Sequence, residues 1–113
     1  MSMRAFEIDA SEYEKRRDVF RMHRWARQTL LRLEKHPNFE SIYFERRGIV
    51  KKLLEEFIPI SRLGLWLMRP GDTLYATCLT GNQPYDAVFE YTRWGSKNTE
   101  QIKIEATTTE TQD

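Results

Sequence analysis

The sequence has few of the residues that build disulfides, zinc cages or membrane spans. Cys78 is the only cysteine among 113 residues, so no disulfide can form within one chain, and two histidines cannot complete a Cys/His zinc cage. The longest apolar run, from Leu63 to Met68, is far shorter than the roughly 20 residues that cross a bilayer. The sequence therefore predicts a cytoplasmic protein with no membrane partner.

The chain also lacks an excess of either positive or negative charge. Eighteen basic residues face seventeen acidic ones, which leaves a net charge of +1 and no overall preference for a polyanion. Hydrophobic residues make up 40% of the chain and charged residues 31%, a composition typical of globular proteins rather than disordered ones. A chain of this length suits one domain, residues 1–113.

The first two thirds of the chain have a helical pattern. Residues 11–36 carry apolar side chains at spacings of three and four, which predicts a basic N-terminal helix within residues 1–37. A second stripe from Ile42 to Phe57 predicts another helix, which Pro59 ends. Residues 60–68 follow as a short third helix or, alternatively, as a buried strand, so that residues 38–69 form a helical segment.

The last third has the pattern of a β-meander, within residues 70–109. β-Branched and aromatic residues gather in three short runs, 73–79, 85–94 and 101–107, which are separated by turn-forming residues. The predicted fold class is therefore α+β, with two N-terminal helices and a short third followed by a three-stranded antiparallel meander.

Two carboxylates lie on neighbouring strands of this meander. Asp86 opens the second strand and Glu105 lies near the end of the third, so antiparallel pairing would bring the two side by side. Carboxylate oxygens are hard ligands that suit Mg²⁺ or Mn²⁺. The alternative is that each carboxylate only solubilises the edge of the sheet.

The residues around these carboxylates carry a resemblance to a known family. Pro84-Tyr85-Asp86, a strand, a turn and Ile104-Glu105-Ala106-Thr107 are similar to the signature of the PD-(D/E)XK restriction-endonuclease-like nucleases. The resemblance covers roughly residues 40 to 109. It implies a partial restriction-endonuclease-like core that acts on nucleic acid with Mg²⁺ or Mn²⁺, in which Asp86 and Glu105 are catalytic metal ligands and the backbone carbonyl of Ala106 is a further ligand.

The chain departs from the family pattern at two points. The family lysine lies two residues after the Glu, where this chain has Thr107, and Lys103 on the other side of Glu105 is the substitute that the sequence offers. The family fold also continues with a helix and a further strand, whereas this chain ends at Asp113. These departures indicate a weak or inactive enzyme, either a fragment of a longer protein or a reduced form of the fold.

Some members of the family have an additional acidic ligand on the first helix. Glu45 and Glu56 are the two candidates for that ligand in this chain. They are eleven residues apart, about three turns, so a continuous helix would place both on one face. The alternative is that each glutamate is an ordinary solvated residue of the helix surface.

A cluster of basic residues offers a second kind of site. Eight basic and two acidic residues lie between Lys15 and Lys35, a local charge of +6. Arg17, Arg21 and Arg24 recur at helical spacing around Trp25, an arrangement that could follow a phosphate backbone while the ring stacks on a base. An acidic protein partner or a solvated helix face would produce the same pattern.

The sequence is compatible with two functions. One is a nucleic-acid-acting domain that resembles a Mg²⁺-dependent nuclease. The other is a small non-enzymatic protein-interaction or regulatory domain of a phage or mobile element, which docks on a partner or forms a homo-oligomer.

Overall fold

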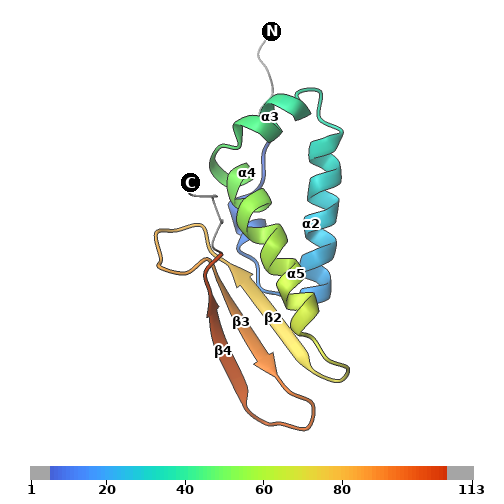
Figure 1. Cartoon of the computed structure of the whole chain (residues 1–113), viewed down its shortest axis with the longest axis vertical. Helices are drawn as coiled ribbons and strands as arrows, with labels where there is room; N and C mark the ends of the chain where they lie inside the picture. Colours follow the sequence, from blue (N-terminus) through green and yellow to red (C-terminus); the bar gives the residue numbers. More distant parts are fainter. Residues whose placement is uncertain (1–5, 107–113) are drawn as a thin grey trace, which may run out of the picture.

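The computed structural model describes residues 6–106, in which helices pack on one face of a four-stranded antiparallel sheet with the strand order β1-β2-β3-β4 (Figure 1). The helical elements are α1 (Ala10–Tyr13), α2 (Val19–Glu34), α3 (Phe39–Glu45), α4 (Gly48–Lys52), the π-helical turn η1 (Leu53–Phe57) and α5 (Ile58–Leu67). The strands are β1 (Arg17–Asp18), β2 (Thr73–Cys78), β3 (Ala87–Thr92) and β4 (Thr99–Ile104). Across the described residues, no helix combines the length and the apolarity that crossing a membrane requires.

The α+β class and the antiparallel meander are confirmed. Strand β3 pairs with β2 on one side and with β4 on the other, so that Ala87 lies opposite both Cys78 and Ile104. Buried side chains alternate along β2, at Leu74, Ala76 and Cys78. This alternation is what a sheet with one covered face produces.

The predicted number of strands is wrong, because a fourth strand, β1, pairs Arg17 with Ala76 at the edge of β2. The same segment divides the helix that was predicted over residues 11–36. Asp18 has extended backbone angles and its carboxylate accepts the Arg21 N–H at 3.0 Å, so a new helix begins after it. A two-residue strand is too short to have a periodic pattern of its own.

The prediction that Pro59 ends the second helix is also wrong. The chain stays helical from Gly48 to Leu67, and η1 lies immediately before the proline. Within η1, the Ile58 N–H donates to the Leu53 carbonyl five residues earlier. Proline lacks an N–H and its ring collides with the carbonyl four residues before it, so the wider π-helical turn accommodates Pro59 inside the helix.

The second helix is instead interrupted earlier, between α3 and α4. Arg46 has left-handed backbone angles, with φ of 42°, and Gly48 has φ of +57°. The Arg46 guanidinium stabilises this corner, because its Nε donates to the Tyr43 carbonyl at 3.0 Å and its Nη1 lies 3.6 Å from Glu55. The corner changes the direction of the chain, so α3 and α4 do not share a face.

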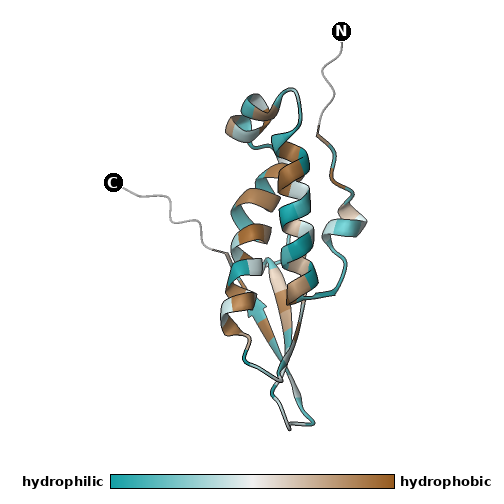
Figure 2. Cartoon of the chain, turned by 90° about the vertical axis from the view of Figure 1, so that its right-hand side faces the viewer, coloured by the Kyte–Doolittle hydropathy of each residue, from teal (hydrophilic) through white to brown (hydrophobic). Residues whose placement is uncertain are grey.

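The core lies between the helices and the sheet. Figure 2 shows hydrophobic residues along much of the α4 to α5 helix, and hydrophobic and hydrophilic turns mixed along α2. The core residues are Tyr13, Val19, Met22, Ala26, Leu53, Phe57, Ile60, Leu74, Ala76, Cys78, Ala87 and Phe89. Helices α2 and α5 approach closely at Gly64, where an added Cβ would lie 2.8 Å from Val19.

Candidate functional site

Asp86 occupies the turn that leads into β3, where it joins two strands. Its N–H donates to the Ile104 carbonyl at 2.7 Å, and its Oδ2 accepts the Ala106 N–H at 2.8 Å. The Asp86 carboxylate is therefore fixed between the start of β3 and the residues that follow β4. Its second oxygen remains for another interaction.

Glu56 reaches this carboxylate from the helical layer. It lies in η1, and its side chain interacts with that of Asp86. Burial, and next the charge of Asp86, raise the pKa of Glu56 above its usual 4.5. The positive charge of Lys52 opposes this rise in pKa. Its Nζ lies 3.6 Å from Glu56 Oε1, which is an ion pair but too long for a hydrogen bond. Glu56 Oε1 therefore has no hydrogen-bond partner among the described residues.

Tyr13 and Cys78 are buried residues whose pKa values respond to the charges of the two carboxylates. The Tyr13 side chain is 1% exposed, and within residues 6–106 its hydroxyl has no hydrogen-bond partner. Burial is the largest cause that raises the pKa of Tyr13, and Cys78, Glu56 and Asp86 add to it. Burial also raises the pKa of the Cys78 thiol to about 12, so the thiol is neutral and does not act as a nucleophile.

The backbone of Glu105 lies beside Asp86, because Asp86 is hydrogen-bonded to both of its neighbours, Ile104 and Ala106. Glu105 is exposed, while Ile104 and Ala106 both pack against the core. No group of three or more His, Cys, Asp or Glu side chains in the described part of the chain is arranged to hold a metal ion. The charge of Asp86 acts on Glu56 in the helical layer, whereas the side chain of Glu105 is exposed.

The remaining residues of the predicted motif lie elsewhere. The Lys103 ammonium is 4.9 Å from the centre of the Tyr85 ring. Glu45 pairs with Arg47 at 3.9 Å, and the prediction that Glu45 shares a helix face with Glu56 is wrong because the chain turns at Arg46 between them. Thr107 lies outside the described residues.

The arginines of the predicted basic helix lie in two different surroundings. Arg17 is 8% exposed, donates to Glu12 at 3.1 Å and lies over the Trp25 ring, so this guanidinium is part of the packed structure. Trp25 itself is half-buried. Arg21 and Arg24 are exposed on α2, where Arg21 lies 3.4 Å from Asp18.

No pattern in the sequence indicates that Tyr13 belongs with Glu56 and Asp86. Tyr13 lies in a four-residue helix, far in sequence from Glu56 and Asp86, so no local spacing connects the three. The one available signal for η1 was Pro59, which follows directly on a helical apolar stripe. A proline at that position indicates either the end of a helix or a π-helical turn.

The raised pKa of Glu56 has a consequence for stability. Because the folded chain holds this proton more tightly than the unfolded chain, the contribution of Glu56 is complete below its usual pKa and is lost as pH rises through the raised value. We therefore expect Glu56→Gln to be more stable than the wild type at about pH 7, with the difference shrinking toward about pH 4. Urea denaturation of both proteins across this range measures the difference.

Glu55→Gln is the matched control for this prediction. Glu55 lies in the same turn and its side chain is 22% exposed, compared with 21% for Glu56, but it pairs with Arg46 rather than with a carboxylate. We expect no gain in stability from this variant. Parallel pH profiles for the wild type and Glu56→Gln would contradict the placement of Glu56 beside Asp86.

Comparison with protein-family models, with curated proteins and with solved structures finds no match for this chain.

Proposed function

We propose that this domain acts on nucleic acid through a divalent cation at Glu56 and Asp86, as a weak or inactive relative of the PD-(D/E)XK nucleases. The observation that carries the proposal is the buried Oε1 of Glu56, which has no hydrogen-bond partner among the described residues and belongs to a helical carboxylate whose pKa the charge of Asp86 raises. The resemblance implies a ligand of this kind on the helix before the meander. The proposal differs from the sequence-based ligand set in giving Glu56 the place beside Asp86.

The residues fit a hard cation. Glu56 Oε1 is buried without a hydrogen-bond partner among the described residues, and Asp86 uses only Oδ2 for the Ala106 N–H. A cation between these carboxylates would remove their mutual repulsion, and oxygen ligands of this type suit Mg²⁺ or Mn²⁺. When bound there, Mg²⁺ supplies a polarised water and stabilises negative charge on a phosphodiester.

The chain's own residues set the limits of this chemistry. Tyr13 contributes a buried, neutral hydroxyl that can donate a hydrogen bond toward the carboxylates. Lys103, the substitute for the family lysine, lies over Tyr85, and the ammonium at the site is that of Lys52, 3.6 Å from Glu56 Oε1. We therefore propose that the domain binds more readily than it cleaves.

A second candidate function is a protein-interaction or regulatory domain. Its support is a set of large side chains that the fold leaves in solvent, with Trp66 81% and Phe44 79% exposed. Aromatic residues are enriched in protein interfaces. An acidic partner protein that uses Arg21 and Arg24, or a homo-oligomer, belongs to this alternative.

The metal proposal predicts that Mg²⁺ or Mn²⁺ stabilises the fold. A ligand that binds only the folded state adds about 2.7 kcal/mol at a concentration 100 times its Kd. We expect the thermal midpoint of the wild type to rise with metal concentration, and the rise to be lost in Glu56→Gln and in Asp86→Asn. Differential scanning calorimetry in Mg²⁺, Mn²⁺ and EDTA measures the shift.

Glu55→Gln again serves as the control, because it removes a carboxylate of similar exposure from the same turn. This variant should retain the full metal-dependent shift. An equal shift in the wild type and in Asp86→Asn would mean that the metal binds elsewhere and would contradict the proposed site.

A further inference from the structure

The far end of the sheet carries a groove that the acidic site does not use. It encloses about 380 Å³ beside the turn between β3 and β4. Its lining includes Arg69, Asp72, Tyr91, Arg93, Trp94 and Glu100. The groove lies one length of β3 away from Asp86, which is about 20 Å at the rise of a strand.

Trp94 is exposed but held in place. Its side chain is largely exposed, with the residue 77% exposed, while its backbone N–H donates to Asp72 Oδ1 at 2.8 Å. Asp72 is itself fixed, because its Oδ2 accepts the Tyr91 hydroxyl. The Trp94 ring lies against Gly71, whose φ of +88° and missing side chain leave room for it. The backbone of Trp94 is therefore fixed and one part of its ring packs on Gly71, which leaves the rest of the exposed indole for a flat ligand.

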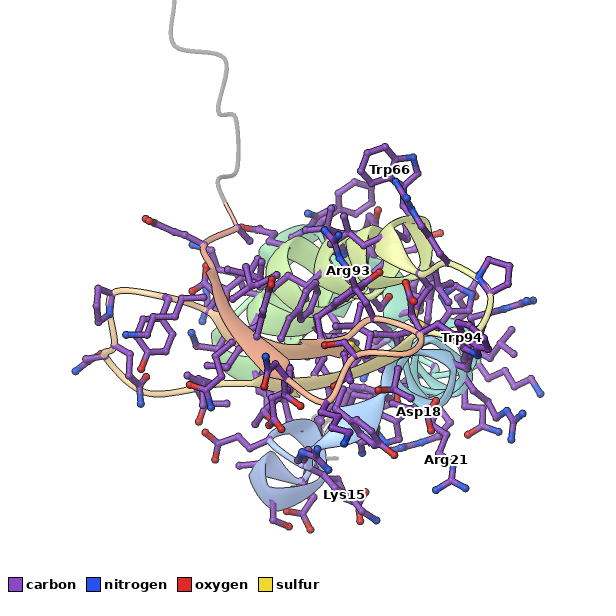
Figure 3. The ribbon with its side chains drawn as sticks, turned by 90° about the horizontal axis from the view of Figure 1, so that it is seen from below. Lys15, Asp18, Arg21, Trp66, Arg93 and Trp94 are labelled. Carbon is purple, nitrogen blue, oxygen red and sulfur yellow. The ribbon has the colours of Figure 1, made fainter. Side chains whose placement is uncertain are left out.

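Arginines flank this indole. Arg69 and Arg93 both line the groove, and neither forms an ion pair with any of residues 6–106. Seen from below, Arg93 lies between Trp66 and Trp94 (Figure 3). Arg62 and Trp66 are exposed one turn apart on α5, the helix that leads to Leu67.

The groove also holds two carboxylates. Asp72 is ionised, because the hydrogen bonds from the Tyr91 hydroxyl and the Trp94 backbone N–H, together with the charge of Arg69, lower its pKa. Glu100 is exposed on β4 and is the one lining carboxylate without such partners among the described residues. Two guanidiniums without an ion-pair partner within residues 6–106, beside an exposed indole, complement a phosphodiester with an unstacked base.

We infer that this groove binds single-stranded nucleic acid, with a base stacked on Trp94 and the adjoining phosphates at Arg69 and Arg93. The inference rests on the proposed function in taking nucleic acid as the ligand. Stacking on an indole needs an unpaired base, and every base offers such a face, so we expect single strands to bind more tightly than duplex and with little sequence preference. The arginines add a salt-dependent contribution from each phosphate.

The test is fluorescence anisotropy of labelled oligo-dT and oligo-rU with the wild-type protein, at about 50 and 200 mM salt. EDTA is present throughout, so the acidic site plays no part. We expect binding that weakens with salt and a Kd that rises roughly 5- to 150-fold in Trp94→Ala, the range for one lost base stack. Trp94→Phe should recover part of this loss, and circular dichroism verifies the fold of each variant.

Charge variants test the groove without touching Trp94. Arg69→Ala with Arg93→Ala should weaken binding and lower the salt slope by about 0.7 for each lost phosphate contact. Glu100→Gln should tighten binding, because it removes the repelling carboxylate. The control is Phe44→Ala with Arg47→Ala, an exposed aromatic and an exposed arginine at the corner between α3 and α4. This control should leave Kd unchanged.

Three results would overturn the inference. The first is the absence of binding at the lower salt concentration, and the second is an equal Kd for the wild type and Trp94→Ala. The third is self-association that Trp94→Ala removes, which would assign the groove to a second copy of the chain. Oligonucleotide binding is measured in EDTA and the metal site is measured by its Mg²⁺-dependent thermal shift, so a failure of the metal site and a failure of this groove give different results.

Discussion

Thr107→Lys is expected to raise Mg²⁺-dependent cleavage by about 10²- to 10³-fold, because a positioned cation near the developing phosphate charge contributes roughly 3 to 4 kcal/mol. Thr107 lies outside the described residues, and the expectation comes from its place two residues after Glu105 in the motif. The wild type should show little or no cleavage. Single-turnover assays on plasmid DNA and on labelled single-stranded oligonucleotides measure the difference.

Two variants make this result specific. Thr108→Lys adds the same charge one residue later and should not restore cleavage, so equal activity in both lysine variants would indicate a general effect of charge. Adding Asp86→Asn to Thr107→Lys should abolish the new activity, because the metal loses a ligand. If Thr107→Lys remains inactive while the Mg²⁺-dependent thermal shift is present, the domain binds metal without nuclease chemistry.

The sequence predicted the parts of the fold that repeat a local pattern. The stripe through Val19, Met22 and Ala26 is the buried side of α2, and the three runs of β-branched residues are β2, β3 and β4. Each of these elements extends over at least six residues, which is long enough for a period to appear. Their order along the chain then gave the meander.

Features that depend on one residue in a tertiary context could not be predicted. Pro59 normally ends a helix, and only the packing of α5 against α2 makes it favourable to widen one turn and continue. Strand β1 has two residues and exists because β2 offers an open edge at Ala76. Both features depend on contacts that form only after the helices and the sheet have packed.

The candidate site likewise has parts that a local sequence pattern predicts and parts that depend on tertiary packing. Asp86 was predicted because a motif places it at the start of a strand, and Glu56 was predicted as one of two acidic candidates on a helix. The sequence could not distinguish Glu56 from the other candidate, Glu45, because the left-handed backbone conformation of Arg46 has no signature in sequence. Tyr13 reaches the site only through tertiary packing, so no spacing in the sequence could have included it.

Phe57→Ala is expected to lower the free energy of unfolding by about 3 to 5 kcal/mol. Phe57 is 1% exposed, and its ring centre lies 5.0 Å from that of Tyr13 and 4.9 Å from that of Trp25. Removing the ring leaves a cavity among aromatic side chains from three separate elements, which cannot all move inward to fill it. A domain with a total stability of about 5 to 15 kcal/mol would lose a large part of it.

Phe44→Ala is the matched control, since Phe44 is 79% exposed and its loss should change stability by less than about 0.5 kcal/mol. Urea denaturation followed by circular dichroism compares the two variants. Phe57 directly follows Glu56 in η1, so the packing of its ring determines how that turn presents the carboxylate to Asp86. If Phe57→Ala were no more destabilising than Phe44→Ala, η1 would not be anchored in the core, and the position of Glu56 in the proposed metal site would lose its support.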